Sequence, residues 1–368
     1  MFSITPSVRL RPSPFHEATL AEGVTSYTVY NRMLMPTGYG KPEEEYWRLI
    51  RGVSQWDVAC ERQVQLQGPD AGRLAQLLCS RDLSKQAIGQ GKYVALCNHK
   101  GVLINDPILL KLADDRFWLS IADSNIWLWA SAIAAERRLR VDVSEPDVSP
   151  MALQGPKAVE VMAHLFGDWV RELKMFWFRQ TALEGIPMIV ARSGWSKQGG
   201  FEIYLMDGTQ GTRLWQLVKE AGKAWDIGPG NPSHCERIES GLLSYGGDTD
   251  EQTNPFEVRL GKYVDLQVSD DVIGIAALRR IAAEGPRRRQ MGVMLDGNIA
   301  AGPRFVWYPM TRAGGAPIGS LNNCVWSWRL QRNIGLALVT SDCAAGDAVT
   351  VALDGAHVAG ELVELPFI

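Results

Sequence analysis

Residues 66–71 read Leu-Gln-Gly-Pro-Asp-Ala, and a close copy, Leu-Gln-Gly-Pro-Lys-Ala, recurs at residues 153–158. Each copy follows an apolar run typical of a strand and precedes a run with helical spacing. Proline is favoured near a helix start because its missing N–H would be unpaired there anyway. The two strand–Gly-Pro–helix copies therefore predict two related α/β subdomains, which is a structural rather than a catalytic indication.

Residues 186–206 contain two apolar runs around a polar, glycine-bearing turn, Arg-Ser-Gly-Trp-Ser-Lys-Gln-Gly-Gly, and this pattern predicts a β-hairpin. Side chains alternate faces along a strand, so Glu202 and Tyr204 share one face. The other face carries Phe201, Ile203 and Leu205. A carboxylate and a phenol beside Trp195 would make a wall for a flat polar ring. The alternative is an amphipathic edge hairpin whose Glu202 and Tyr204 face solvent.

The composition is that of a globular protein, with 368 residues, 46% hydrophobic and 21% charged. This length predicts two or three domains. The formal charge of -3 argues against a nucleic-acid or anionic-membrane partner. Six cysteines without a CxxC pair and five scattered histidines predict no metal site. The first residues lack the apolar core of a signal peptide, and no run approaches the ~20 apolar residues of a membrane span, so we expect a cytoplasmic protein.

Asp106 interrupts an otherwise apolar run within Asn105-Asp106-Pro107. A carboxylate in such a run is costly to bury without a partner or ligand, which favours a functional residue. A turn-capping aspartate is the alternative. Elsewhere, helical spacing predicts helices at 43–52, 124–138, 211–225 and 234–244. From about residue 288, short β-runs predict a C-terminal all-β domain with strands at 290–295, 304–308, 317–320, 335–339, 348–351 and 357–363.

These landmarks occur in the order seen in the glycine-cleavage T-protein (aminomethyltransferase) family, which the chain resembles over nearly its whole length. The matching stretches are 56–58 (Trp-Asp-Val), 68–71, 101–106, 192–195, 200–203, 237–242 and 334–337. Within the family the chain is most similar to the tetrahydrofolate-dependent demethylases of dimethylsulfoniopropionate, through 23–31, 56–64, 105–107, 117–123, 145–150, 193–204 and 238–246. Residues 35–40 and 94–100 depart from that pattern, and this bears on the methyl donor more than on the folate site.

The resemblance implies an α+β fold: a three-domain ring around a central folate channel, with two related α/β subdomains and a C-terminal β-barrel. Residues 1–50 and 140–265 would form the folate-binding domain, 51–139 the second α/β domain, and 280–368 the barrel.

The resemblance also implies an enzyme that moves a methyl group from a small donor, dimethylsulfoniopropionate above all, to N5 of tetrahydrofolate. Asp106 would act near N5 as the catalytic carboxylate. Glu202 would accept charge-assisted hydrogen bonds from the pterin. Like Asp106 and Glu202, Arg237 stands at a folate-binding position of the family, and it would pair with a carboxylate, either in the protein or on a ligand. The remaining cofactor-binding expectations are the aromatic residues Tyr93, Tyr204 and Trp195.

The donor site would be lined by Tyr30, Trp177 and Trp195, since aromatic rings attract a sulfonium cation. Core packing is the alternative for Trp177. Rival activities are a glycine-cleavage-type aminomethyltransferase and an O- or N-demethylase of another small compound. A non-enzymatic folate-binding factor is disfavoured, because residues 260–278 lack the cysteine of that branch's motif. A homodimer is compatible with all of these activities.

Overall fold

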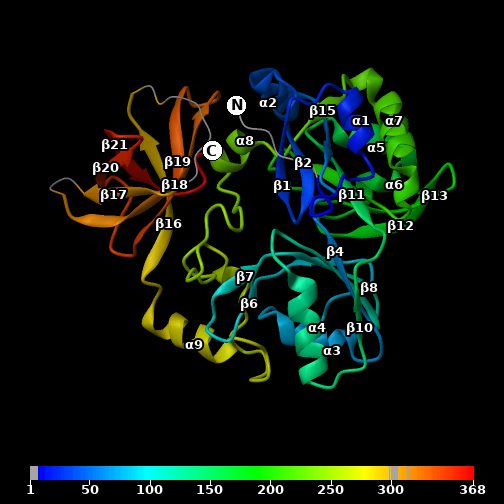
Figure 1. Cartoon of the computed structure of the whole chain (residues 1–368), viewed down its shortest axis with the longest axis horizontal. Helices are drawn as coiled ribbons and strands as arrows, with labels where there is room; N and C mark the ends of the chain where they lie inside the picture. The colour runs from blue at the N-terminus through cyan, green and yellow to red at the C-terminus, as the bar shows by residue number, and fades with distance from the viewer. Residues whose placement is uncertain (1–6, 298, 300–305, 313–314) are drawn as a thin grey trace. The chain divides into compact units, whose positions relative to one another are not determined.

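The structure is a computed structural model that describes residues 7–297, 299, 306–312 and 315–368 (Figure 1). The chain divides into two compact units. The first comprises Met1–Ala75, Leu83–Tyr93 and Pro107–Ser233, and the second comprises Gln76–Asp82, Val94–Asp106 and His234–Ile368.

The first unit contains a six-stranded sheet in the order β12-β13-β14-β11-β3-β15. Its strands are β3 (Ser54–Asp57), β11 (Ser149–Gln154), β12 (Phe178–Leu183), β13 (Ile186–Ala191), β14 (Gly200–Leu205) and β15 (Gly228–Gly230). Neighbouring strands are antiparallel except β15, which runs parallel to β3. The second Gly-Pro copy follows β11 directly.

Helices cover one face of this sheet: α1 (His16–Ala21), α5 (Ala158–Phe166) and α7 (Gly211–Gly222) (Figure 1). The core between these layers joins the alternate β14 residues Phe201, Ile203 and Leu205 to Val161, Met162, Leu214 and Trp215. At roughly 1.5–3 kcal/mol for each large apolar side chain fully buried, this layer stabilises the unit strongly. The same unit also holds the hairpin of β1 (Ser26–Tyr30) and β2 (Met33–Gly38), and the helices α2 (Pro42–Arg51) and α6 (Trp169–Glu172).

A five-stranded sheet in the order β10-β4-β9-β8-β5 belongs to the same unit. Its strands are β4 (Gln63–Gln67), β5 (Gly91–Tyr93), β8 (Ile108–Ala113), β9 (Arg116–Ser120) and β10 (Asp142–Ser144). The first Gly-Pro copy leads from β4 into α3 (Ala71–Leu78), and α4 (Ile126–Glu136) precedes β10. Each copy thus joins a strand to a helix, as the sequence predicts.

The two sheets pack against each other through a second core. Leu110 and Trp118 of the five-stranded sheet pack against Ile189 and Tyr204 of the six-stranded one.

The hairpin predicted for 186–206 is confirmed as β13–β14, with Ala191 opposite Glu202. Its solvent-facing alternative is wrong, because Glu202 is 5% exposed and Tyr204 is fully buried. Period-two alternation shows which side chains share a face, and here the second sheet covers that face.

The second unit ends in a closed six-stranded barrel, β16-β19-β18-β17-β20-β21. Its strands are β16 (Arg288–Leu295), β17 (Tyr308–Arg312), β18 (Pro317–Ser327), β19 (Arg332–Thr340), β20 (Ala348–Leu353) and β21 (Ala356–Val363). Alternate residues fill its core, as with Met291, Val293 and Leu295 on β16. This confirms the predicted all-β domain. Residues 304 and 305 of the strand predicted for 304–308 lie outside the described residues, and of the other three only Tyr308 is in a strand, where β17 begins.

The same unit contains the ribbon of β6 (Leu96–Cys97) and β7 (Leu103–Asn105), and the helices α8 (His234–Glu239) and α9 (Ile275–Glu284). Helices predicted at 43–52, 124–138 and 211–225 are confirmed as α2, α4 and α7. The helix predicted for 234–244 is shorter than expected, because Gly241 takes a left-handed φ of 61° and the Leu242 N–H donates back to the Arg237 carbonyl. The three-domain boundaries stay a prediction.

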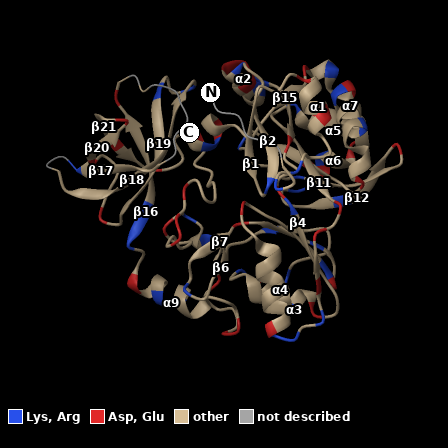
Figure 2. Cartoon of the chain, in the orientation of Figure 1, with Lys and Arg blue, Asp and Glu red and all other residues tan. Residues whose placement is uncertain are grey.

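Acidic and basic side chains are interspersed, as on α2 and α7 (Figure 2). All six cysteines are buried and free. Among the described residues, no helix has the length and apolar character needed to cross a membrane.

Candidate functional site

Glu202 is the best-defined candidate among the predicted site residues. It lies in the middle of β14, between Ala191 of β13 and Ala152 of β11. The Ser193 hydroxyl donates to its Oε2, and the Tyr204 hydroxyl donates to the same oxygen at 3.0 Å. Among the described residues, no protein group donates to Oε1. The carboxylate is therefore fixed through one oxygen, while the other remains available as an acceptor.

Burial raises the pKa of Glu202, and the hydrogen bonds from Ser193 and Tyr204 oppose that rise. A buried carboxylate disfavours its charged form unless donors compensate. Donors from a ligand to Oε1 would therefore stabilise the charged form further. The amino-pyrimidinone edge of a pterin carries such N–H groups, so the residues present fit this ligand.

Tyr204 lies in the core between the two sheets. Burial raises the pKa of its phenol well above the usual value, so the hydroxyl stays protonated and can donate. The structure therefore connects Tyr204 to Glu202 through its hydroxyl, while its ring packs in the protein core. Its expected role in cofactor binding stays a prediction.

The other aromatic candidates of the first unit are partly exposed. Trp195 lies in the loop between β13 and β14, two residues beyond Ser193. Trp177 is near the start of that loop, since its carbonyl accepts from the Arg192 N–H at 2.9 Å. Tyr30 ends β1 and packs against the helix-side core. Tyr93 ends β5, opposite Ile108. Trp177 thus lies beside the loop that carries Trp195, and the donor-site role of all three predicted residues stays a prediction.

Asp106 belongs to the second unit and follows β7 directly, with the boundary to the first unit at Pro107. The apolar run that it interrupts is thus divided between two strands, β7 and β8. Asp106 is partly exposed, whereas the preceding Asn105 is fully buried.

Arg237 also lies in the second unit, on α8, and its ion-pair partner is a protein carboxylate. Its Nη1 lies 2.8 Å from Asp248 Oδ2, and both side chains are almost fully buried. Asp248 also accepts from the Ser244 N–H and from Asn323. Of the two predicted partners, the structure shows the one within the protein. Breaking such a buried pair usually costs about 3–5 kcal/mol, so Arg237 has a structural role whatever else it binds.

Two polar residues near β11 were missed at the sequence level. Ser193 donates to Glu202, yet a serine in a glycine-rich turn is ordinary in sequence. Asp57, on β3, is 2% exposed and accepts from the Ser13 hydroxyl at 2.5 Å. Burial raises the pKa of Asp57 to about 6. The hairpin register is the feature that points to Ser193, since Glu202 faces Ala191 at the start of the turn.

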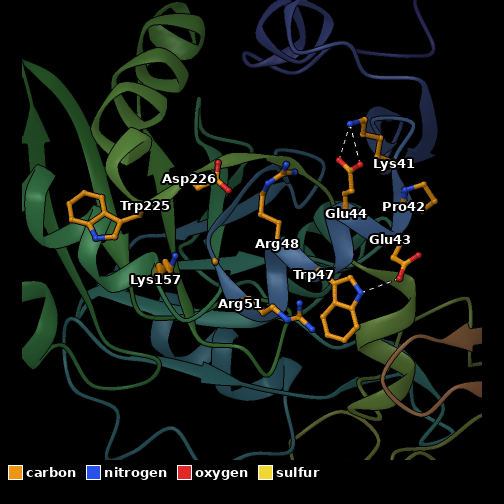
Figure 3. Close-up of a pocket in the computed structure, with 11 residues that line it drawn as sticks. Lys41, Pro42, Glu43, Glu44, Trp47, Arg48, Arg51, Lys157, Trp225 and Asp226 are labelled. Atoms are coloured by element: carbon orange, nitrogen blue, oxygen red, sulfur yellow. Dashed lines mark hydrogen bonds and ion pairs between the residues drawn. The ribbon is translucent and has the colours of Figure 1, made fainter.

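An open groove of about 710 Å³ lies elsewhere on the first unit, beside α2 (Figure 3). Arg51 stacks on Trp47 with its guanidinium carbon 3.9 Å from the ring centroid, and Lys41 pairs with Glu44. None of the predicted site residues lines it. Arg48 donates to the Pro229 carbonyl at 3.3 Å, so the charged side chains of the groove contact both protein groups and each other.

The described residues contain no group of three or more His, Cys, Asp or Glu side chains that could hold a metal ion. Comparison with known families then gives the decisive observation. The GCVT N-terminal domain matches residues 15–268, and the glycine cleavage T-protein C-terminal barrel domain matches residues 288–368. The chain belongs to the glycine-cleavage T-protein family.

Relatives of this T-protein family member carry two kinds of name. Dimethylsulfoniopropionate demethylase DmdA of Ruegeria pomeroyi is 42% identical over 339 residues, which are 92% of each chain. The aminomethyltransferase of Symbiobacterium thermophilum is 30% identical and covers 97% of each chain. The crystal structure of the glycine cleavage system aminomethyltransferase T from Bartonella henselae superposes with a TM-score of 0.86 over 98% of both chains, at 22% identity. The predicted family, T-protein fold and enzyme class are thereby confirmed.

Proposed function

We propose that this T-protein family member is a tetrahydrofolate-dependent demethylase that moves a methyl group from dimethylsulfoniopropionate to N5 of tetrahydrofolate. The observation that carries the proposal is the 42% identity, over 92% of both chains, to an enzyme named for demethylating that compound. Identity to the aminomethyltransferase of Symbiobacterium thermophilum is lower, at 30%.

Glu202 supports a folate site independently of those names. Its Oε2 is held by two hydroxyl donors while its Oε1 remains available, so the carboxylate has one defined direction for a ligand. Charge-assisted hydrogen bonds are roughly twice as strong as neutral ones, and they fix orientation. We propose that Oε1 accepts from the pterin edge and so sets the angle of the ring.

Bound tetrahydrofolate would supply the N5 lone pair for the new N–CH3 bond. The S–CH3 bond of the sulfonium breaks, its electron pair stays on sulfur, and a neutral sulfide leaves without needing an acid. Asp106 would accept the proton that N5 releases, which is the role that the family resemblance implies for it. The protein's contribution is alignment of the two reactants, which reaches ~7–11 kcal/mol in favourable cases.

The decisive experiment is incubation of the purified chain with tetrahydrofolate and a panel of donors, followed by mass spectrometry of the folate. Dimethylsulfoniopropionate, glycine betaine and a methoxybenzoate form the panel. We expect 5-methyltetrahydrofolate from the first donor. Formation of it only from glycine betaine or only from the methoxybenzoate would reject the sulfonium donor and leave the demethylase class standing.

An aminomethyltransferase is the second candidate, because curated aminomethyltransferases match up to 97% of this chain. An aminomethyltransferase would act on an aminomethylated lipoyl carrier and give ammonia and methylenetetrahydrofolate. Turnover in that assay, with none from any methyl donor, would replace the demethylase proposal.

Two variants test the proposed residues. We expect Glu202→Ala and Asp106→Ala each to abolish or strongly reduce folate-dependent turnover while each variant still folds, as a cooperative thermal transition shows. Glu184→Ala is the matched control, since Glu184 is an exposed carboxylate of the first unit that pairs with Arg213. Parental kinetics in both test variants would refute the assignment of the site.

A further inference from the structure

The loop between β13 and β14 is held by one buried amide. The Gln154 side chain, at the end of β11, is 1% exposed. Its Nε2 donates to the Ser193 carbonyl at 3.2 Å and to the Phe201 carbonyl at 3.5 Å. Its Oε1 accepts from the Ser196 hydroxyl at 2.7 Å. A single side chain from the second Gly-Pro copy thus contacts both ends and the middle of the loop.

The loop backbone packs directly on this amide. Gly194 and Gly200 have φ angles of 146° and 154°, where only glycine is comfortable. A Cβ at either position would lie less than 3.0 Å from the Gln154 side chain. The Gly199 carbonyl also accepts from the Gly155 N–H at 2.9 Å. The glycine-rich turn is therefore shaped to fit around Gln154.

Ser193 links this loop to Glu202. Its carbonyl is held by Gln154, and its hydroxyl donates to Glu202 Oε2. Because Ser193 and Glu202 are both buried, the loop cannot shift at Ser193 without breaking a hydrogen bond to a buried carboxylate. Such an unmade bond is expensive in a low-dielectric environment.

We propose that Ser193 and Gln154 are positioning residues for folate: they hold Glu202 so that Oε2 is occupied by protein hydroxyls and Oε1 is directed to the ligand. This inference rests on the proposed function and extends it to two residues that do not themselves touch the ligand. It also assigns a role to the second Gly-Pro copy, because Gln154 is part of it.

Removal of the Ser193 hydroxyl has a consequence that ordinary destabilisation lacks. Its hydrogen bond counteracts the rise in the pKa of Glu202 that burial causes. Without it the pKa rises further, so the charged form that a pterin's N–H groups require is reached only at higher pH. In the variant without the hydroxyl, the rise in folate affinity with increasing pH should therefore occur at higher pH than in the parent.

The experiment measures tetrahydrofolate dissociation constants between pH 5 and 9 for the parent, Ser193→Ala, Ser193→Thr, Gln154→Ala, Ser196→Ala and Gln67→Ala. Loss of one hydrogen bond to a charged group corresponds to roughly 10- to 100-fold weaker binding, which we expect for Ser193→Ala together with an upward shift of the pH midpoint. Ser193→Thr, which keeps the hydroxyl, should restore both. Gln154→Ala should weaken binding, and Ser196→Ala should do so less. Gln67 is the exposed counterpart of Gln154 in the first copy. Gln67→Ala is therefore the matched control and should bind tetrahydrofolate as the parent does.

Glu202→Gln separates failure of this inference from failure of the proposed function. If Glu202→Gln loses binding but Ser193→Ala keeps the parental affinity and pH midpoint, the positioning role is wrong and the folate site stands. If Glu202→Gln binds as well as the parent, the folate site itself is refuted. Should Gln154→Ala fail to fold, Ser196→Ala decides for Gln154, because it removes only one contact of the amide. Parental binding in Ser196→Ala would then reject Gln154.

Discussion

The two Gly-Pro copies have nearly the same backbone and different surroundings. Gly68 and Gly155 have φ angles of 140° and 121°, and each N–H donates to a carbonyl remote in sequence at 2.9 Å. In both copies the alanine three residues on donates back to the glycine carbonyl at 3.0 Å. The acceptors differ, however: Gly68 bonds to Asp115, whereas Gly155 bonds to Gly199 in the loop next to Glu202.

The side chains around the copies differ more strongly. The Gln67 side chain is exposed and its Oε1 accepts from Gln65, whereas the Gln154 side chain is buried and holds the loop. Strand β11 is flanked by two buried carboxyl groups, Glu202 opposite Ala152 and Asp57 opposite Met151. Beside β4, the facing acidic residue is the exposed Asp142, opposite Gln67. The two copies thus share their backbone conformation, but only the strands beside the second copy carry buried carboxyl groups.

The largest expected effect comes from the feature that both copies share. A Cβ at Gly155 would lie less than 3.0 Å from the carbonyl oxygens of Gly52 and Leu49, and a Cβ at Gly68 would meet that of Arg140. With the positive φ added, Gly155→Ala should destabilise the protein by about 3–5 kcal/mol. Gly68→Ala should cost somewhat less, because it meets one such oxygen. Urea denaturation of both variants measures this difference.

The same two glycine variants should also differ in how tightly they bind folate. At denaturant-free conditions where both variants remain folded, Gly155→Ala should lose folate affinity and Gly68→Ala should retain it. Equal loss of affinity in the two variants would show that the first copy supports the site as well as the second.

The sequence could reveal the shared feature because it is local. A repeated Gly-Pro between a strand and a helix carries its own steric reason, and alternation along residues 200–205 correctly placed Glu202 and Tyr204 on one face. Alternation could not show that the second sheet covers that face, since Leu110 and Trp118 lie more than eighty residues away in the chain. The solvent-facing alternative therefore remained open until the packing was known.

Partner choice was equally beyond the sequence. The sequence predicts a carboxylate partner for Arg237 but does not identify it. In the structure this partner is Asp248, which the turn after α8 brings to Arg237. Ser193 had no distinguishing pattern, and its importance follows from a buried acceptor nine residues later. Both cases depend on side-chain geometry, which a single sequence does not encode in any short-range period.

The next effect concerns the buried Asp57 beside β11. Burial raises its pKa from 3.8 to about 6, so the fold favours the protonated form. This contribution to stability is fully present below pH 3.8 and is lost as the pH rises through 6. The shift corresponds to about 3 kcal/mol. Relative to the parent, Asp57→Asn should therefore gain about 3 kcal/mol in unfolding free energy between pH 4 and pH 8.

Asp142→Asn is the matched control for Asp57, since Asp142 is the exposed aspartate beside β4. Its unfolding free energy should follow that of the parent across the same pH range. A flat difference between Asp57→Asn and the parent would mean that Asp57 is charged in the fold, stabilised by Ser13 and the Ala59 N–H, and that the two copies differ less in their electrostatics than in their packing.

The smallest effect lies at the one position where the copies themselves differ in charge. Asp70 accepts from the Arg140 N–H at 2.9 Å, which lowers the pKa of Asp70, whereas Lys157 has no acidic partner among the described residues. Asp70→Ala should lower the melting temperature by no more than about 3 °C at pH 7, because exposed pairs contribute little. A lowered pKa means that this stability is present above the unfolded value, near 4, and is lost as the pH falls through the folded one. The difference from the parent should therefore disappear towards pH 2.

Lys157→Ala should leave the melting temperature unchanged at both pH 7 and pH 2. If instead Lys157→Ala lowered it as much as Asp70→Ala does, the second turn would also depend on a charged contact, and the copies would differ in the sign of that charge but not in how they are held.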